Sequence, residues 1–259
     1  MRIPIRMIGI ATTFFWIFLL AYLISAVYSV KDLHFDFGEP NISLTEENQI
    51  VFSIPVILKN NGLYSIDFFN VTSKIYDKES FFVAEGSTFI PTIKKGEEVS
   101  TTHSITIDCA NFLQNHTNYL FEDAKLNVYA AVSLRLAEMI PVEASTNLSL
   151  PWGAPFYNFS LGEPEITDFN VTHLRLAVPI SFENHAFFDV GGNIQLKMYD
   201  EAELLVSQGE IAFETQKYSY YNGFAEFYVP TDEAPSKGRF EVYFATPLFN
   251  YGPLVIPYD

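Results

Sequence analysis

The sequence predicts an all-β protein, with two tandem β-sandwich domains after one N-terminal transmembrane helix. Three observations support this fold class. An apolar run near the N-terminus has no charged residue, apolar and polar residues alternate through much of the remainder, and several short motifs occur twice, about 124 residues apart. That offset matches an ordinary domain, so the 259 residues hold two domains behind the helix.

The N-terminal region predicts a membrane anchor. Residues 7–30 carry no charge, and at about 1.5 Å per residue a helix of that length crosses the hydrocarbon core of a bilayer. Two positively charged residues, Arg2 and Arg6, precede this helix. After the helix, the positive charge of Lys31 is balanced by the negative charge of Asp32. The positive-inside rule therefore predicts a cytoplasmic stub of residues 1–6 and extracellular C-terminal domains in a single-pass protein of the cell membrane. Residues 26–29 do not have the small-x-small pattern of a signal peptidase site, which favours an uncleaved anchor. A cleaved signal peptide is the alternative.

The strongest repeated motif is Ile54-Pro55-Val56 before Asn60, which recurs as Val178-Pro179-Ile180 before Asn184. Around each motif every second residue is apolar, as in a half-buried strand. The prolines fall on the outward phase, and proline has no amide hydrogen to donate to a neighbouring strand. In both copies this strand is therefore predicted to be an edge strand or a bulged strand.

The domain limits follow from the repeats and from one proline-rich segment. The predicted domains cover residues 33–150 and 156–259, separated by a stiff linker at residues 151–155. Trp152 in this linker is expected to pack between the domains, with a stacking platform for a ligand as the alternative. A short helical insert is expected near residues 109–121 of the first domain only, capped by Asp108.

Charge and sequons agree with an external location. The formal charge of −16 repels the phosphates of nucleic acids, so no nucleic-acid partner is expected. Asn-x-Ser/Thr sequons mark candidate glycosylation sites on an external surface, although the same residue types also populate turns. The six candidates are Asn41, Asn70, Asn115, Asn147, Asn158 and Asn170.

No pattern in the chain indicates catalysis, a cofactor or a metal. The single cysteine, Cys109, excludes an intrachain disulfide and is expected to be a buried small hydrophobe. The five histidines are not spaced as metal ligands on one strand face. A weaker possibility is that acidic residues after two equivalent strands gather as oxygen ligands for Ca²⁺. These residues are Asp77, Glu79, Asp200, Glu201 and Glu203.

Both copies have the same order of elements: an alternating strand, an Asn-containing turn, a strand ending in Tyr, a hydroxyl-rich hairpin and a last strand. The turns contain Asn60 and Asn184, the strand ends are Tyr76 and Tyr199, and the last strands are residues 126–130 and 240–244. This order resembles the LEA14-like or WHy domain (water stress and hypersensitive response). The resemblance covers both predicted domains and implies a Greek-key β-sandwich of immunoglobulin or fibronectin III type. It also implies a protective, scaffolding or binding role, in a family with no known catalytic residues.

Three functions remain open. The leading hypothesis is a non-enzymatic envelope scaffold or interaction module, bound to the lipid bilayer by its helix and to an envelope or membrane protein partner. The second is an extracellular receptor for a solute or polymer, or a transporter accessory subunit, with its site at the domain junction near Trp152. An enzyme ranks third, because none of the searched catalytic motifs is present.

Overall fold

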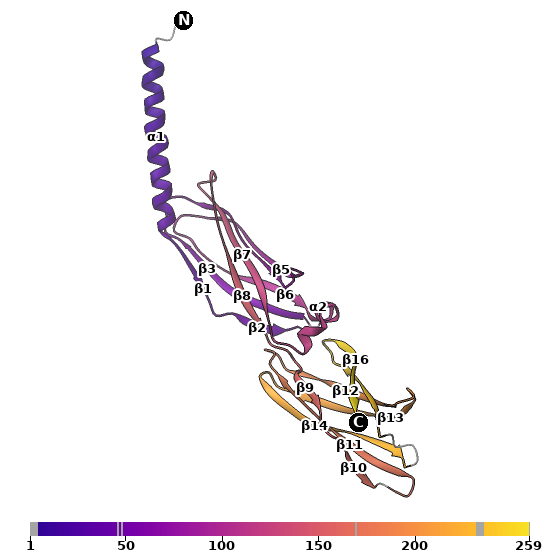
Figure 1. Ribbon diagram of the computed structural model, residues 1–259. Helices are drawn as coiled ribbons and strands as arrows, with labels where there is room; N and C mark the ends of the chain where they lie inside the picture. Colours follow the sequence, from indigo (N-terminus) through magenta and orange to yellow (C-terminus); the bar gives the residue numbers. More distant parts are fainter. Residues whose placement is uncertain (1–4, 46, 48, 169, 232–235, 259) are drawn as a thin grey trace.

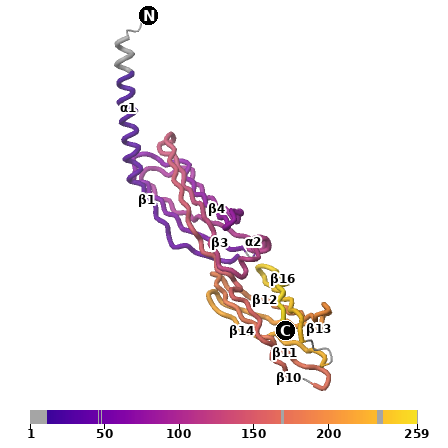
Figure 2. The backbone as a smooth tube through the Cα atoms, in the orientation of Figure 1, coloured from indigo at the N-terminus to yellow at the C-terminus, as the bar shows by residue number. Residues whose placement is uncertain are grey.

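A computed structural model describes residues 5–45, 47, 49–168, 170–231 and 236–258. Helix α1 (Ile5–Lys31) leads into two β-rich halves that lie end to end and slant away from the helix, as Figures 1 and 2 show. The helix includes the predicted span of 7–30 and extends past it at both ends. Residues 12–31 are long and apolar enough to cross a membrane. Of the predicted stub, residues 1–4 lie outside the described residues.

Each half contains eight strands in the same order. The strands of the first half are β1 (Leu33–Phe37), β2 (Asn41–Leu44), β3 (Gln49–Asn60), β4 (Ile66–Tyr76), β5 (Phe82–Ile93), β6 (Glu98–Asp108), β7 (Ala124–Leu136) and β8 (Ile140–Trp152). Those of the second are β9 (Tyr157–Leu161), β10 (Glu165–Asp168), β11 (His173–Asn184), β12 (Val190–Asp200), β13 (Leu205–Thr215), β14 (Ser219–Pro230), β15 (Gly238–Ala245) and β16 (Asn250–Tyr258). The all-β prediction is confirmed.

Each half forms two four-stranded antiparallel sheets. In the first half, β1 and β2 pair in succession with β3, which pairs on its other side with β6, and the second sheet has the order β5-β4-β7-β8. The second half repeats this pattern, with β9 and β10 beside β11 and β14, and with the order β13-β12-β15-β16. Strand β8 runs through Trp152, so the sheet continues into the predicted linker.

The repeated prolines lie beside a bulge and not in an edge strand. Residues 38–40, between β1 and β2, face Ile54 and Pro55 of β3, so three residues oppose two. The same count holds where residues 162–164 face the strand β11. The Gly38 amide donates to the Pro55 carbonyl at 2.9 Å, and the equivalent bond in the second half is 2.8 Å. The edge alternative is wrong, because strands pair on both sides of β3 and β11. The extra residue lies in the segment that faces each proline and not in β3 or β11 themselves, so these strands are not the bulged ones.

A buried asparagine closes the turn after β3 and after β11. Asn60 is fully buried, and its amide group donates to the carbonyls of Tyr64 and Ile93 at 2.9 and 3.1 Å. Asn184 makes the same pair of bonds to the carbonyls of Phe188 and Gln216, both at 3.0 Å. In each turn the side-chain oxygen also accepts the amide hydrogen of the residue two positions later. The repeated Asn is therefore a structural tie, since it satisfies backbone groups that would otherwise be buried without partners.

The helical insert of the first half is broken into two pieces. Helix α2 (Cys109–Asn115) begins at Asp108, whose side chain accepts the Asn111 amide hydrogen at 3.0 Å, as predicted. A single 3₁₀ turn, η1 (Thr117–Leu120), follows it. The apolar residues expected to face inward, which are Phe112, Leu113 and Leu120, are all buried. The insert thereby packs against the end of the first half that contacts the second (Figure 1).

The hydrophobic core is continuous between the halves but divided inside the first half. One cluster runs from residues such as Phe52 and Ile105, through Trp152, into the whole second half. A smaller cluster around Phe69 and Leu134 occupies the other end of the first half. Two separate cores within one sandwich indicate an incompletely filled interior, because domains usually have one contiguous core.

Candidate functional site

Trp152 is sealed between the halves. It is 1% exposed, and its indole nitrogen donates to the Tyr119 carbonyl at 2.9 Å. Its ring contacts Phe112 of the first half and Phe187 of the second, with centroids 5.2 and 6.0 Å away. The prediction that it packs between the halves is confirmed. A ligand cannot stack on this ring in the folded molecule because both of its sides are covered.

A second aromatic contact holds the junction. The Phe156 amide, which directly precedes β9, donates to the Leu120 carbonyl of the first half at 2.9 Å. Its fully buried ring lies 5.0 Å from that of Phe182 and 4.5 Å from that of Phe244. Phe121 of the first half packs on Phe244 as well, at 5.9 Å. The two halves therefore share one aromatic core.

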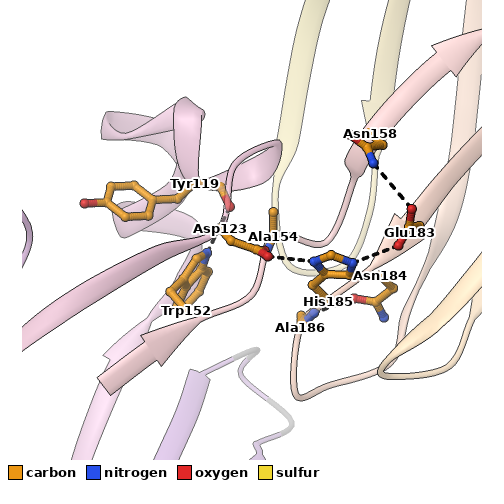
Figure 3. Close-up of polar contacts among 9 residues, drawn as sticks. All are labelled: Tyr119, Asp123, Trp152, Ala154, Asn158, Glu183, Asn184, His185 and Ala186. Carbon is orange, nitrogen blue, oxygen red and sulfur yellow. Dashed lines mark hydrogen bonds and ion pairs between the residues drawn. The ribbon is translucent and has the colours of Figure 1, made fainter. Parts of the chain in front are cut away.

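A histidine between two carboxylates ties the junction on its polar side (Figure 3). The ring of His185 lies 2.7 Å from Asp123 Oδ2 through Nδ1 and 2.9 Å from Glu183 Oε2 through Nε2. It also stacks on Tyr157, with centroids 4.2 Å apart. Asp123 belongs to the first half, whereas His185 and Glu183 belong to the second. The ring therefore bridges the two halves.

The main chain reinforces this bridge. The Ala154 amide donates to Asp123 Oδ1 at 2.9 Å, and the Ala154 carbonyl accepts the His185 amide hydrogen at 3.0 Å. Gly153 passes so close that a Cβ atom there would lie 1.8 Å from the His185 carbonyl oxygen. Any larger residue at position 153 would force the halves apart.

The electrostatics of the bridge favour a charged imidazole. Partial burial by itself would lower the pKa of His185, but hydrogen bonds and charge from Asp123 and Glu183 outweigh it and raise the pKa. The hydrogen bond from His185 is the main cause that lowers the pKa of Glu183, and the Asn158 amide adds to it. The three groups thus form an ion triad, which is a structural arrangement, since the histidine has no nucleophile among its bonded partners.

At the other end of the first half, helix α1 is fixed to the turn after β3. Ser29 of α1 is fully buried, and its hydroxyl oxygen accepts the amide hydrogens of Leu63 and Tyr64 at 2.8 and 3.3 Å. A Cβ atom on Gly62 would lie 2.4 Å from the Ser29 hydroxyl, so only glycine fits there. One turn earlier, the Ser25 hydroxyl lies 2.6 Å from the Tyr64 hydroxyl. We call this contact the helix joint (Ser25, Ser29, Gly62, Leu63 and Tyr64).

The first half also contains an apolar cavity of about 500 Å³ between its two sheets. It lies between the two cores described above, and its lining includes Val71 of the smaller core and Ile105 of the larger one. Gly38 and Pro40 border it on one sheet, and residues 144–146 and 148 of β8 border it on the other. A volume of this size is within the range of about 300–1,000 Å³ that small-molecule sites occupy. A smaller hollow of about 270 Å³ lies at the rim of the junction, beside Ile50 and Phe188.

The six sequons are spread over both halves. Asn70 lies in β4 and is half-buried, with its side-chain oxygen accepting the Ser87 hydroxyl hydrogen at 3.1 Å. Its neighbours Val71 and Ile75 are buried on the opposite face, as the alternation predicts. Asn158 lies beside the junction, where its amide donates to Glu183 at 3.4 Å. The exposed candidates are Asn41, Asn115, Asn147, Asn158 and Asn170.

The acidic residues considered for Ca²⁺ have structural roles instead. Asp77 closes a turn by accepting the amide hydrogens of Glu79 and Phe81, and Asp200 does the same for Leu204. Among the described residues, no group of three or more His, Cys, Asp or Glu side chains is arranged to hold a metal ion. Cys109 is fully buried, and loss of solvation raises its pKa to about 12. The thiol is therefore inert at physiological pH.

Comparisons with known proteins add little. No family model and no curated protein matches the chain. Solved structures give weak likenesses: a structural-genomics target (12% identity, TM-score 0.31, 48% of this chain and 88% of that one) and the putative ApaA protein from Bordetella pertussis (16%, 0.30, 48% and 94%). Red sea bream transglutaminase is similar over 88% of this chain and 31% of its own, with 13% identity and a TM-score of 0.30. TM-scores this low carry no argument about function.

Proposed function

We propose that this protein is a non-enzymatic scaffold or interaction module, anchored by α1 in the cell membrane and displaying both sandwiches outside the cell. The single observation that supports this most is the helix joint. Buried Ser29 bonds α1 directly to the first half, so no flexible segment separates the anchor from what it carries. The aromatic junction then extends the same rigid connection to the second half.

Rigid connections suit a protein that presents a surface at a set distance from the bilayer. The ring contacts of Trp152 with Phe187 and of Phe121 with Phe244, together with the ion triad, hold the halves in one relative orientation. Domains joined by a bare linker move freely. In this proposal an envelope or membrane protein is the partner and the exposed sequons are glycosylated. The resemblance to the LEA14-like or WHy domain agrees with a protective or scaffolding role.

The orientation can be tested by cysteine labelling in intact cells. Met139 and Leu204, which are 71% and 65% exposed, are replaced one at a time by cysteine and treated with a membrane-impermeant maleimide. Native Cys109 is an internal control, because its burial and raised pKa keep it unlabelled. We expect both variants to be labelled before the cells are broken. Labelling that begins only after lysis would place the sandwiches inside the cell and overturn the proposal.

An external receptor is the second candidate, and the cavity of the first half favours it. The cavity is separate from Trp152, whose ring is covered by both halves. A receptor function would therefore use the interior of the first sandwich and not the junction. Binding of a small molecule that persists when Trp152 is replaced would distinguish this site from one at the junction.

A further inference from the structure

The duplication makes the second half an internal reference for the first. Register pairs Ser73, Ile75 and Val71 of β4 with Ala130, Val128 and Val132 of β7, and their counterparts in β12 and β15 pair in the same way. Five of these positions line the cavity in the first half: Val71, Ser73, Val128, Ala130 and Val132. The second half has Ile194, Leu196, Phe240, Val242 and Phe244 at the corresponding positions, and each is 2% exposed or less.

The cavity therefore exists because larger side chains are missing from one copy of the same fold. The first half has Val where the second half has Phe, and Ser where the second half has Leu. The space between the sheets of the first half therefore lacks several methylene-sized groups that fill the second half. An interior left empty in this way loses dispersion contacts and destabilises the sandwich. An occupant that restores those contacts offsets the loss.

The walls of the cavity select an uncharged occupant. His103, the ionisable group among its lining residues, is 3% exposed, and burial lowers its pKa, so the ring is neutral near pH 7. Both ring nitrogens already have partners at 3.0 Å, the hydroxyls of Thr88 and Ser73. The wall thus offers no charge and no unpaired ring nitrogen, and apolar surface dominates the remainder.

The cavity opens to solvent beneath β8. In this strand, Ala144, Thr146 and Leu148 pair across from cavity-lining residues of β7, yet all three are exposed, with Leu148 at 57%. Strand β8 is exposed on both faces over residues 143–149, whereas an ordinary sandwich strand alternates. An extended molecule can therefore enter at this edge and leave a polar end in water.

We propose that the cavity holds one hydrocarbon chain of a membrane lipid, with the headgroup outside beneath β8. At roughly 30 Å³ for a group the size of water, the cavity holds on the order of fifteen such groups, which is a single chain and not a globular partner. The first half is also the half fixed to α1 by the helix joint, so a bilayer that contains α1 lies on its side of the molecule. This site is additional to the scaffold function and does not depend on it.

The test uses the full chain in detergent-free phosphatidylcholine vesicles doped with phosphatidylcholine that carries a photoreactive diazirine near the end of one acyl chain. After irradiation, mass spectrometry locates the attached lipid. We expect adducts on peptides from β7 and β8 in addition to those on α1. Adducts confined to α1 would overturn the proposal.

Two kinds of variant make the test specific. Val128→Phe with Val132→Phe fills the cavity with the residues of the second half, and Tyr129→Trp enlarges an outward-facing residue of the same strand as its control. We expect the filled variant to lose adducts on β8 about tenfold, because apolar contact with the chain is removed. Equal labelling in the filled variant and in the control would contradict the proposal.

The second variant does not disturb the interior. Leu148→Glu places a charge at the mouth of the cavity, and Phe89→Glu is the matched control, because both residues are 57% exposed and Phe89 does not line the cavity. We expect Leu148→Glu alone to reduce labelling of β7. A loss of equal size in both variants would show that surface charge, and not the cavity, governs the labelling.

Discussion

At the scale of single residues, the two buried asparagines explain why the same motif occurs twice. Each satisfies three main-chain groups in a turn, and a buried polar group without a partner is strongly unfavourable. The aliphatic residues that precede them in β3 and β11 occupy alternate positions of the strand, so in both halves they share the inward face. A short repeated sequence thus specifies a strand, a bulge and a turn together.

Replacement of Asn184 by Ala is expected to lower the free energy of unfolding by about 2–3 kcal/mol, because two carbonyls and one amide lose their partner. Chemical denaturation followed by circular dichroism measures this change. Asn193→Ala, at an exposed position of β12, serves as the control and should change stability by less than about 0.5 kcal/mol. Similar losses in both variants would contradict the structural role.

The ion triad predicts a pH dependence. The pKa of His185 is raised above its ordinary value of 6.5, so its stabilising contribution is complete below that value and is lost as pH rises through the folded-state pKa. The pKa of Glu183 is lowered from 4.5, so its contribution is lost as pH falls below that value through the folded-state pKa. We therefore expect the difference in unfolding free energy between the wild type and His185→Gln to be greatest between about pH 5 and 6.5 and to decline at higher pH.

Denaturation curves across that pH range measure the difference. His34→Gln is the control, since His34 is exposed and its ring contacts the carbonyl of Asp32. A difference for His185→Gln that is constant with pH would show that the bridge between the halves is not ionic.

Sequence alone reached some of these residues and missed others. The inward phase of β3 and β11, the Asp108 cap and the burial of Cys109 follow from periodicity and composition, which act locally. The partners of His185 are 62 positions away at Asp123 and two away at Glu183, so spacing along the chain gave no signal of the triad. Contacts between halves depend on how the sheets dock, and a linear pattern does not encode that.

At the scale of elements, the helix joint makes α1 part of the same packed structure as the first half. The last turns of α1 are packed on the turn after β3, with Ala26 and Ser29 both buried. The sequence predicted an anchor followed by a domain. It gave no sign that a serine in the apolar run serves as an acceptor for the domain.

Ser29→Ala is expected to loosen this contact selectively. The Leu63 and Tyr64 amides lose their acceptor, so their hydrogen exchange should accelerate by about tenfold, equivalent to about 1.4 kcal/mol. Ser25→Ala is the matched control, because Ser25 contacts the Tyr64 hydroxyl and leaves both amides bonded. Unchanged exchange in Ser29→Ala would show that the joint does not hold the two parts together.

Element order was more predictable than element pairing. Each strand of the first half has a counterpart in the second half, so the duplication in the sequence predicted that both halves have the same order of strands. The proline left an edge strand and a bulged strand as alternatives, and neither describes β3, because β3 pairs on both sides and the extra residue lies in the segment that faces it. The cavity could have been found by aligning the copies, since Val128 and Val132 stand where Phe240 and Phe244 fill the second half.

At the scale of the whole molecule, the shared aromatic core predicts that the two halves neither unfold nor move independently of each other. Trp152→Ala should lower the free energy of unfolding by about 3–5 kcal/mol, because a fully buried indole is lost between them. It should also broaden the distribution of distances between spin labels on cysteines introduced at positions 139 and 204. Electron paramagnetic resonance measures that distribution.

Tyr220→Ala is the control for this prediction, since Tyr220 is a 64% exposed aromatic residue of the second half. It should leave the distances unchanged. A sharp, unaltered distribution in Trp152→Ala would mean that the ion triad alone maintains the orientation.

The helix joint has a mechanical consequence. A helix in a bilayer tilts to match the local thickness of the hydrocarbon layer. In the proposed membrane-anchored arrangement, the bonds from Ser29 and the packed junction carry a change in helix tilt through both halves. The same change of tilt then displaces the far tip of the second half more than it displaces the helix joint.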